Sequence, residues 1–124
     1  MFAFFDGDNI GDTIKRSLLE GNVDSARETS KRITSSLKEI EIFIDNYPEI
    51  EIIIIGGDDL LIKYPEETYA YKLLEEIRAI FSENMNHQNT FSCGVGKSIE
   101  EAIQNLDKAK LFGKNQIFPY KDIK

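Results

Sequence analysis

The sequence predicts an α+β fold in which helices pack on one antiparallel sheet. Three observations lead to this prediction. Short apolar β-type segments alternate with longer helical segments, in the order β-α-β-β-α-β and then a last helix and a short strand. The two central β segments flank a glycine-containing turn, as in a hairpin. The length of 124 residues suits one domain, 1–124, with a single core.

The first strand and the first helical segment follow each other closely. Phe2 to Phe5 is a short apolar run that ends at the loop-like sequence DGDNIG. From Asp12 to about Asn46 the pattern is helical, with an interruption at Gly21-Asn22. Asp12 is the residue type expected at a helix N-cap. Pro48 closes the segment.

The centre of the chain predicts a hairpin. Residues 49–55 and 60–64 are β-rich, and Gly56-Gly57-Asp58-Asp59 lies between them. Such residues are common in turns, so a purely structural polar turn remains an alternative interpretation.

The C-terminal half supplies the remaining elements. Residues 67 to about 86 are helical, 90–95 form a strand, 98 to about 112 form a helix, and 116–118 allow a last short strand. Ser98 and Glu101 have capping-box spacing, and Gly113 stands where a helix C-cap is expected. The first six elements match the split βαβ, or ferredoxin-like, order, which places the first strand beside the central hairpin with helices on one face.

Composition excludes several classes of protein. With 15 Lys and Arg against 22 Asp and Glu, the net charge of −7 argues against binding of long nucleic acids through their backbone. No apolar run approaches the roughly 20 residues of a membrane span, and the acidic N-terminus does not resemble a signal peptide. The single cysteine, Cys93, excludes an internal disulfide. These features predict a cytoplasmic protein with no membrane partner.

Four aspartates lie at positions where they could together form a cation-binding site. Asp6 and Asp8 follow the first strand, and Asp58 and Asp59 occupy the hairpin turn. If these elements are sheet neighbours, their mutual repulsion favours binding of a cation, and an all-oxygen ligand set suits Mg²⁺ or Mn²⁺. Such a site serves phosphoryl or nucleotidyl transfer.

The hairpin turn sets the details of that site. Gly56 and Gly57 allow a tight turn and a close approach of a nucleotide to the backbone. Adjacent strand residues point to opposite faces, so Asp58 and Asp59 share a metal only if the turn breaks this alternation. We therefore favour Asp6 and Asp58 over Asp59.

Three ordered motifs carry a family resemblance over essentially the whole chain. FFDGDNIG, IIIIGGDDLLIKY and CGVGKSIEEAIQNLDKAKLFGKN resemble the palm domains of GGDEF-type nucleotide cyclases, and more closely the GGDD palms of type III CRISPR large subunits. A chain of 124 residues without accessory domains is similar to the stand-alone minimal CRISPR polymerases. The resemblance implies a metal-dependent palm that joins nucleoside triphosphates into cyclic nucleotides, with two palms facing each other as a homodimer.

The resemblance also implies roles for individual residues. Asp6, the Gly7 carbonyl, Asp58 and Asp59 match the metal ligands, and the three aspartates match the catalytic acids. The resemblance implies a triphosphate contact for Lys110, with Lys114 in the basic position beside it. From their places in the sequence, Asp8 and Asn9 are weaker candidates, and Gly56 and Gly57 are candidates because they lack side chains. Without the resemblance, compensation of the helix dipole explains the lysines equally well.

One departure from the family pattern concerns the base. Diguanylate-forming relatives carry an Asn eight residues after the metal aspartate, where it reads guanine, but this chain has Ile14. An apolar side chain supplies no such hydrogen bonds, so ATP is the expected substrate in preference to GTP.

The sequence therefore predicts a nucleotidyltransferase that condenses ATP into a cyclic di- or oligonucleotide with release of pyrophosphate, and the family's setting suggests prokaryotic antiviral signalling. Two alternatives stay open. The chain can be a non-catalytic nucleotide-binding sensor or regulatory palm, or a ferredoxin-like interaction domain whose acids have no chemical role.

Overall fold

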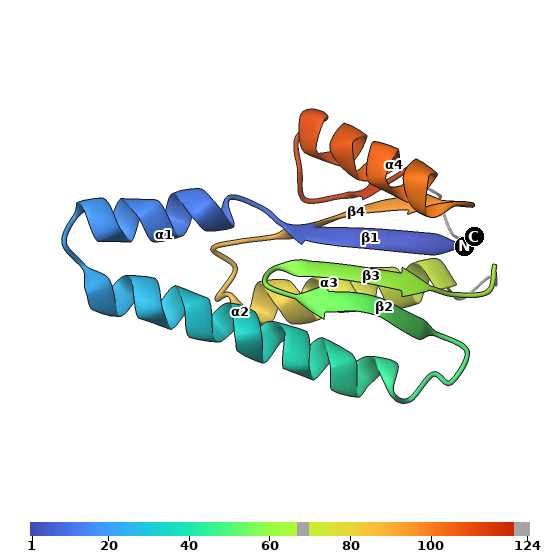
Figure 1. Ribbon diagram of the computed structural model, residues 1–124, viewed down its shortest axis with the longest axis horizontal. Coiled ribbons are helices and arrows are strands. Elements are labelled where there is room, and N and C mark those ends of the chain that lie inside the picture. The colour runs from blue at the N-terminus through green and yellow to red at the C-terminus, as the bar shows by residue number, and fades with distance from the viewer. Residues whose placement is uncertain (67–69, 121–124) are drawn as a thin grey trace.

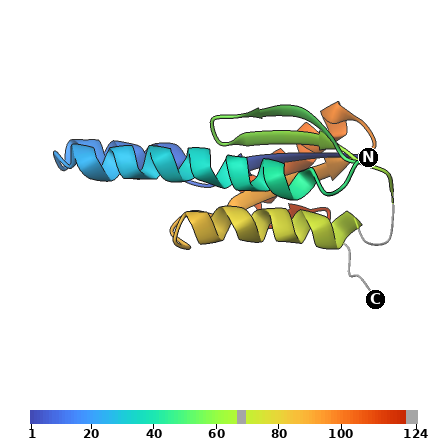
Figure 2. The same ribbon diagram turned by 90° about the horizontal axis from the view of Figure 1, so that it is seen from below.

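The computed structural model describes residues 1–66 and 70–120. The chain forms one five-stranded sheet with helices on both of its faces (Figures 1 and 2). The elements follow in the order β1 (Phe2–Gly7), α1 (Ile10–Leu19), α2 (Val23–Ile44), β2 (Glu51–Gly56), β3 (Asp59–Lys63), α3 (Ala70–Asn84), β4 (Phe91–Gly96), α4 (Ile99–Leu111) and β5 (Ile117–Phe118).

The order of the strands confirms the predicted arrangement. The sheet runs β2-β3-β1-β4-β5, with every neighbouring pair antiparallel except β4 and β5, which are parallel. The first strand therefore lies between the hairpin and β4, and Asp6 pairs with Asp59 across the β1–β3 ladder. This register places the end of β1 beside the hairpin turn.

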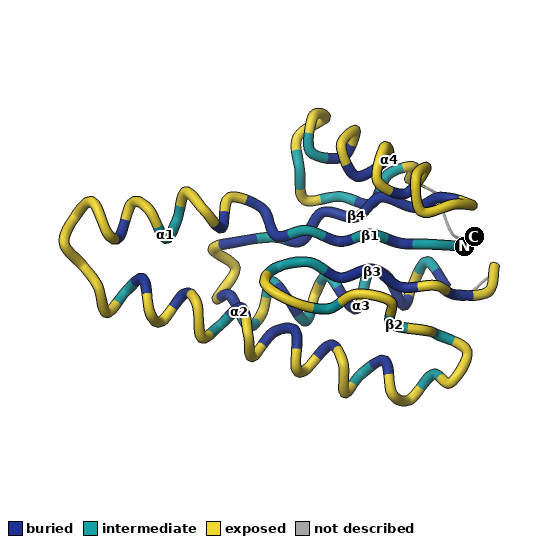
Figure 3. The backbone as a smooth tube through the Cα atoms, viewed as in Figure 1, coloured by how far each residue is buried: buried dark blue, intermediate teal, exposed yellow. Residues whose placement is uncertain are grey.

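The core lies between the sheet and the helices α2 and α3. Ala3 and Phe5 of β1 face it, and the apolar residues at helical spacing along α2, namely Ile33, Leu37, Ile40 and Ile44, are all buried. Figure 3 shows this buried line on α2. Along α3 the expected Leu73, Ile77 and Phe81 are buried and Ile80 is half-buried. The beginning of the helix predicted from residue 67 lies outside the described residues.

The helix α4 packs on the opposite face, over β4 and β1. Gly94 and Gly96 of β4 make this possible, because a Cβ atom at Gly94 would overlap the Leu106 amide nitrogen and the Ala102 carbonyl oxygen. Glycine inside a strand is typical of such a close approach. The Ser98 hydroxyl accepts a hydrogen bond from the Glu101 amide at 3.1 Å, so the predicted N-cap of this helix is confirmed.

The long helical segment is two helices that form a hairpin extending beyond the sheet (Figure 1). Gly21, at φ +74°, makes the turn, and the Asn22 side chain caps α2 by accepting from the Ser25 amide. The prediction of Asp12 as N-cap is wrong. The chain turns at Asn9, at φ 61°, so the helix begins at Ile10 and Asp12 lies in the first turn, where a negative charge favours the helix dipole.

Within residues 1–66 and 70–120, no helix combines the length and the apolar character that crossing a bilayer requires.

Candidate metal and nucleotide site

Three carboxylates converge at the end of the sheet where β1 meets the hairpin. Asp6 comes from β1, Asp59 from the first position of β3, and Asp58 from the turn between β2 and β3. Each offers one oxygen atom, and these three atoms lie within 4.8 Å of one another. The sequence predicted Asp6 directly after the first strand and Asp58 and Asp59 in the hairpin turn. The structure places Asp6 within β1 and Asp59 within β3, and it brings all three together.

The hairpin turn explains how two adjacent aspartates reach the same place. Gly57 takes φ +59° at the first central position of a two-residue turn, which non-glycine residues rarely adopt. Asp58 is therefore a turn residue, outside the strand alternation that governs Asp59. The Gly7 amide donates to the Asp58 carbonyl at 3.1 Å and fixes the tip to β1. Asp59 is thus as well placed as Asp58, although we had favoured Asp58.

Gly7 lets the two segments approach closely. A Cβ atom there would lie 2.7 Å from Ile10 Cγ1 and 3.0 Å from Asp58 Oδ2. A larger residue would push the turn carboxylate away from Asp6.

Burial and the neighbouring carboxylates shift the pKa values of Asp58 and Asp59. Burial, and then the neighbouring Asp6, raise the pKa of Asp58 above its usual value. Burial, the hydrogen bond to Asp6 and the charges of Asp6 and Asp58 raise the pKa of Asp59 to about 7. Both shifts show that a further negative charge is unfavourable here, so the cluster favours a cation. Three close carboxylates form the hard-oxygen ligand set that Mg²⁺ and Mn²⁺ prefer.

One lysine already faces the cluster. Lys110 Nζ of α4 lies 3.1 Å from Asp6 Oδ2 and 2.7 Å from Asp8 Oδ1, and it donates to the backbone carbonyls of Asp6 and Gly7 at 3.2 and 3.0 Å. Burial lowers the pKa of Lys110, but the hydrogen bonds and charges of Asp8 and Asp6 outweigh this effect and raise it. The ammonium therefore stays protonated at neutral pH.

Asp8 is separated from the other acids by its surroundings. Its side chain is 2% exposed, and its oxygens accept from the hydroxyls of Thr90 and Ser92 at 2.6 and 2.8 Å and from the Asn115 amide at 3.2 Å. With Lys110 these donors occupy both carboxylate oxygens. Asp8 thus anchors Lys110 and the segment after α4, and it presents no free oxygen to a ligand.

Asn9 and Lys114 meet at the outer edge of the site. Lys114 Nζ donates to Asn9 Oδ1 at 2.6 Å; Asn9 is exposed, and Lys114, like Lys110, is half-buried. Both take positive φ angles, 61° for Asn9 and 63° for Lys114. The lysine is thus held near the end of β1, where its charge faces solvent.

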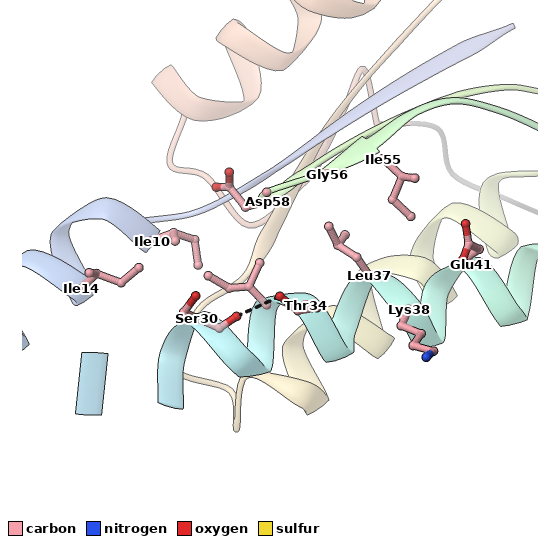
Figure 4. Close-up of a pocket in the computed structure, with 12 residues that line it drawn as sticks. Ile10, Ile14, Ser30, Thr34, Leu37, Lys38, Glu41, Ile55, Gly56 and Asp58 are labelled. Atoms are coloured by element: carbon pink, nitrogen blue, oxygen red, sulfur yellow. Dashed lines mark hydrogen bonds between the residues drawn. The ribbon is translucent and has the colours of Figure 1, made fainter. Parts of the chain in front are cut away.

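A cavity of about 600 Å³ adjoins the carboxylates. Gly56, Gly57 and Asp58 form one end of it, and the helices α1 and α2 form its walls. In Figure 4, Leu37 and Ile55 point into the gap between α2 and the hairpin. The lining residues are Ile10, Ile14, Ser30, Ile33, Thr34, Leu37, Lys38, Glu41, Ile55, Gly56, Gly57 and Asp58.

One wall of this cavity contains a residue that the sequence had singled out, and the opposite wall on α2 contains polar residues that it had not. Ile14 lies in the first of these walls, as its alignment with a base-reading position suggested. Ser30, Thr34 and Lys38 of α2 were not singled out, although their spacing of four residues beside the buried Ile33 was a usable signal. The donors Thr90, Ser92 and Asn115 were also missed, because nothing in their local sequence marks them.

The family model described as "mCpol: minimal CRISPR polymerase domain" matches residues 2–120. A search of curated proteins finds no match. Among solved structures, crystal structures of a Csm1-Csm4 cassette in complex with one ATP, with cA4 and with cA3 are similar, with TM-scores of 0.80, 0.78 and 0.81 and identities of 20, 19 and 18%. Each match covers 98% of this chain but 20% of the other, so the chain spans one fifth of the length of these proteins. At these identities the likeness shows the shared fold.

Proposed function

Because the chain belongs to the minimal CRISPR polymerase family, we propose that it is a metal-dependent nucleotidyltransferase that condenses ATP into a cyclic di- or oligonucleotide. The observation that carries this proposal is the cluster of Asp6, Asp58 and Asp59 at the mouth of a cavity large enough for a nucleoside. Three close carboxylates repel one another, and a turn with a purely structural role does not need them.

Different residues contact the base and the phosphates of the bound nucleotide. The base of ATP enters the apolar cavity between Ile14 and α2, and the triphosphate leaves it past the turn glycines, which have no side chains to obstruct it. Lys110 and Lys114 supply positive charge beside the phosphates. Ile14 offers no donor or acceptor to the edge of guanine, which supports ATP as the preferred substrate.

Asp6, Asp58 and Asp59 would hold Mg²⁺ or Mn²⁺, with the Gly7 carbonyl as a further oxygen. The bound ion would withdraw charge from the α-phosphate and stabilise the departing pyrophosphate. The oxygen of a ribose hydroxyl on a second nucleotide forms a bond to the α-phosphorus and its proton passes to water. The bond between the α-phosphorus and the α–β bridging oxygen breaks, and pyrophosphate leaves.

Two nucleotides must meet for this reaction. In residues 1–66 and 70–120 we find one carboxylate cluster of this kind, with one cavity beside it. We therefore propose that two copies of this single domain, 1–124, face each other as a homodimer, each holding one nucleotide. The complexes of the Csm1-Csm4 cassette with ATP, cA3 and cA4 support nucleotide chemistry of this class. Membership of the family supports a role in prokaryotic antiviral signalling, and we place the protein in the cytoplasm.

Mass spectrometry of products tests the proposal directly. The protein is incubated separately with each of the four ribonucleoside triphosphates and Mn²⁺, and pyrophosphate is measured in parallel. We expect a cyclic oligoadenylate from ATP, its loss in Asp58→Asn, and its retention in Asp24→Asn, which removes one carboxylate that is 97% exposed and distant from the site. Binding of ATP without any product would instead identify a sensor module, and absence of metal-dependent binding would refute both.

A further inference from the structure

The ammonium group of Lys110 is surrounded by more acceptors than it has donors. Its three N–H groups face four oxygen atoms within 3.2 Å: Asp8 Oδ1, Asp6 Oδ2 and the carbonyls of Asp6 and Gly7. Two of these acceptors, the Asp6 carboxylate and the Gly7 carbonyl, belong to groups that the proposed function assigns to the metal. A phosphate contact alone does not require this position.

We propose that Lys110 is an internal counter-cation of the carboxylate cluster, and that a divalent metal binds there in exchange for its ammonium group. The inference rests on the proposed function, because it takes the metal to bind at this cluster. Two cations held by the same carboxylate and the same carbonyl group repel each other strongly, so the ammonium group leaves Asp6 and Gly7 when the ion enters.

Asp8 keeps the displaced lysine within reach of the site. The Asp8 carboxylate is buried and is held by Thr90, Ser92 and the Asn115 amide, none of which touches the metal-ligand oxygens. Its bond to Lys110 Nζ, at 2.7 Å, is the shortest of the four and is independent of the metal ligands. Asp8 is thus a positioning residue that acts through Lys110.

This exchange couples metal to nucleotide. While Lys110 contacts Asp6 and Gly7, no N–H group is left for a phosphate oxygen. Once the metal displaces it, two of its donors are freed beside the triphosphate. Metal and nucleotide therefore bind with positive coupling through one side chain, and removal of that side chain removes the coupling.

Titration of Mn²⁺ without nucleotide, followed by electron paramagnetic resonance, tests the exchange apart from catalysis. We expect Lys110→Met to bind Mn²⁺ about tenfold more tightly than the unmodified protein, since a competing cation has gone. Lys108→Met removes the same charge from the exposed side of α4 and should change the affinity by less than about twofold. A non-hydrolysable ATP analogue should tighten Mn²⁺ binding less in Lys110→Met than in the unmodified protein.

The double variant Asp8→Asn/Lys110→Met provides a folded protein without the Lys110 charge in case the single variant is unstable. Lys110→Met leaves a buried carboxylate without its cation, which destabilises the fold, whereas the double variant neutralises both partners. It should regain thermal stability and keep the tighter Mn²⁺ binding. Equal or weaker Mn²⁺ binding by both Lys110 variants would overturn the inference and leave the proposed function standing. Absence of Mn²⁺ binding in every protein, with and without the analogue, would overturn both.

Discussion

The change in the free energy of unfolding caused by Asp59→Asn measures the electrostatic repulsion among the three clustered carboxylates. The carboxylate oxygens of Asp59, Asp6 and Asp58 lie within 4.8 Å of one another. At 4.8 Å, two unit charges repel by about 0.9 kcal/mol at the dielectric constant of water and by about 3.5 kcal/mol at an effective value of 20. Asp59 is half-exposed, so the lower figure applies to each of its two neighbours. After the attraction of Lys110 is subtracted, Asp59→Asn should stabilise the metal-free protein by about 1 kcal/mol at pH 8.

The pH dependence gives this prediction its sign. The pKa of Asp59 is raised from 3.8 to about 7 on folding, so between these values the folded state binds more protons than the unfolded state. The stability of the protein in EDTA should therefore fall as the pH rises from about 4 to about 7. The variant lacks this contribution, so the two proteins should be equally stable near pH 4, where Asp59 begins to titrate in the unfolded state, and should diverge toward pH 8.

Thermal unfolding in EDTA at several pH values is the assay. A difference of about 1 kcal/mol raises the melting temperature of a domain this size by about 4 °C. Added Mg²⁺ should reverse the order, because ligand at 100 times its dissociation constant stabilises the intact site by about 2.7 kcal/mol and the variant has lost one ligand. The exposed Asp24→Asn serves as control. Parallel pH curves for Asp59→Asn and the unmodified protein, or a less stable variant at pH 8 in EDTA, would refute the reasoning.

Three further predictions follow from the contacts of single residues. Asp58→Ala should abolish product formation and leave the protein folded, with urea unfolding in EDTA at pH 8 showing a gain of about 1 kcal/mol, because the repulsion by Asp6 and Asp59 is removed and the turn's bond to Gly7 is made by backbone. Ile14→Asn should raise the rate with GTP relative to ATP in product assays, since an amide in the cavity can pair with guanine. Gly94→Ala should cost about 1–3 kcal/mol in urea unfolding and lower activity, because its methyl group would push α4 and Lys110 off the sheet.

The sequence was sufficient for the parts of this protein that depend on local patterns. Apolar spacing and turn residues located the strands and helices, and the β-α-β-β-α-β order then predicted that Asp6 and the hairpin would be neighbours. Gly94 and Gly96 also carried the signal that an element approaches β4 closely, although that signal alone does not say which helix does so.

Other features depend on contacts between distant segments. Asp6, near the end of β1, and Asp8, just after it, are two residues apart, yet one is half-exposed and the other is buried. Asp8 is buried because the hydroxyls of Thr90 and Ser92 and the backbone amide of Asn115, all more than 80 residues away in the chain, donate hydrogen bonds to its carboxylate. Likewise the cavity exists only because the turn at Gly21 folds α2 back along α1.

The proposed function assigns base recognition and bond formation to different elements, so substitutions in one need not alter the other. The cavity walls come from the helical hairpin α1–α2, which extends beyond the sheet, whereas the carboxylates and Lys110 come from β1, the β2–β3 turn, β3 and α4 (Figure 1). Among the described residues, Asp58 alone is both a member of the carboxylate cluster and a residue that lines the cavity. Substitutions on the hairpin, such as at Ile14, can therefore alter the preferred base without moving a metal ligand. A substitution at Asp58 removes chemistry while the cavity walls remain, so such a variant should still bind ATP.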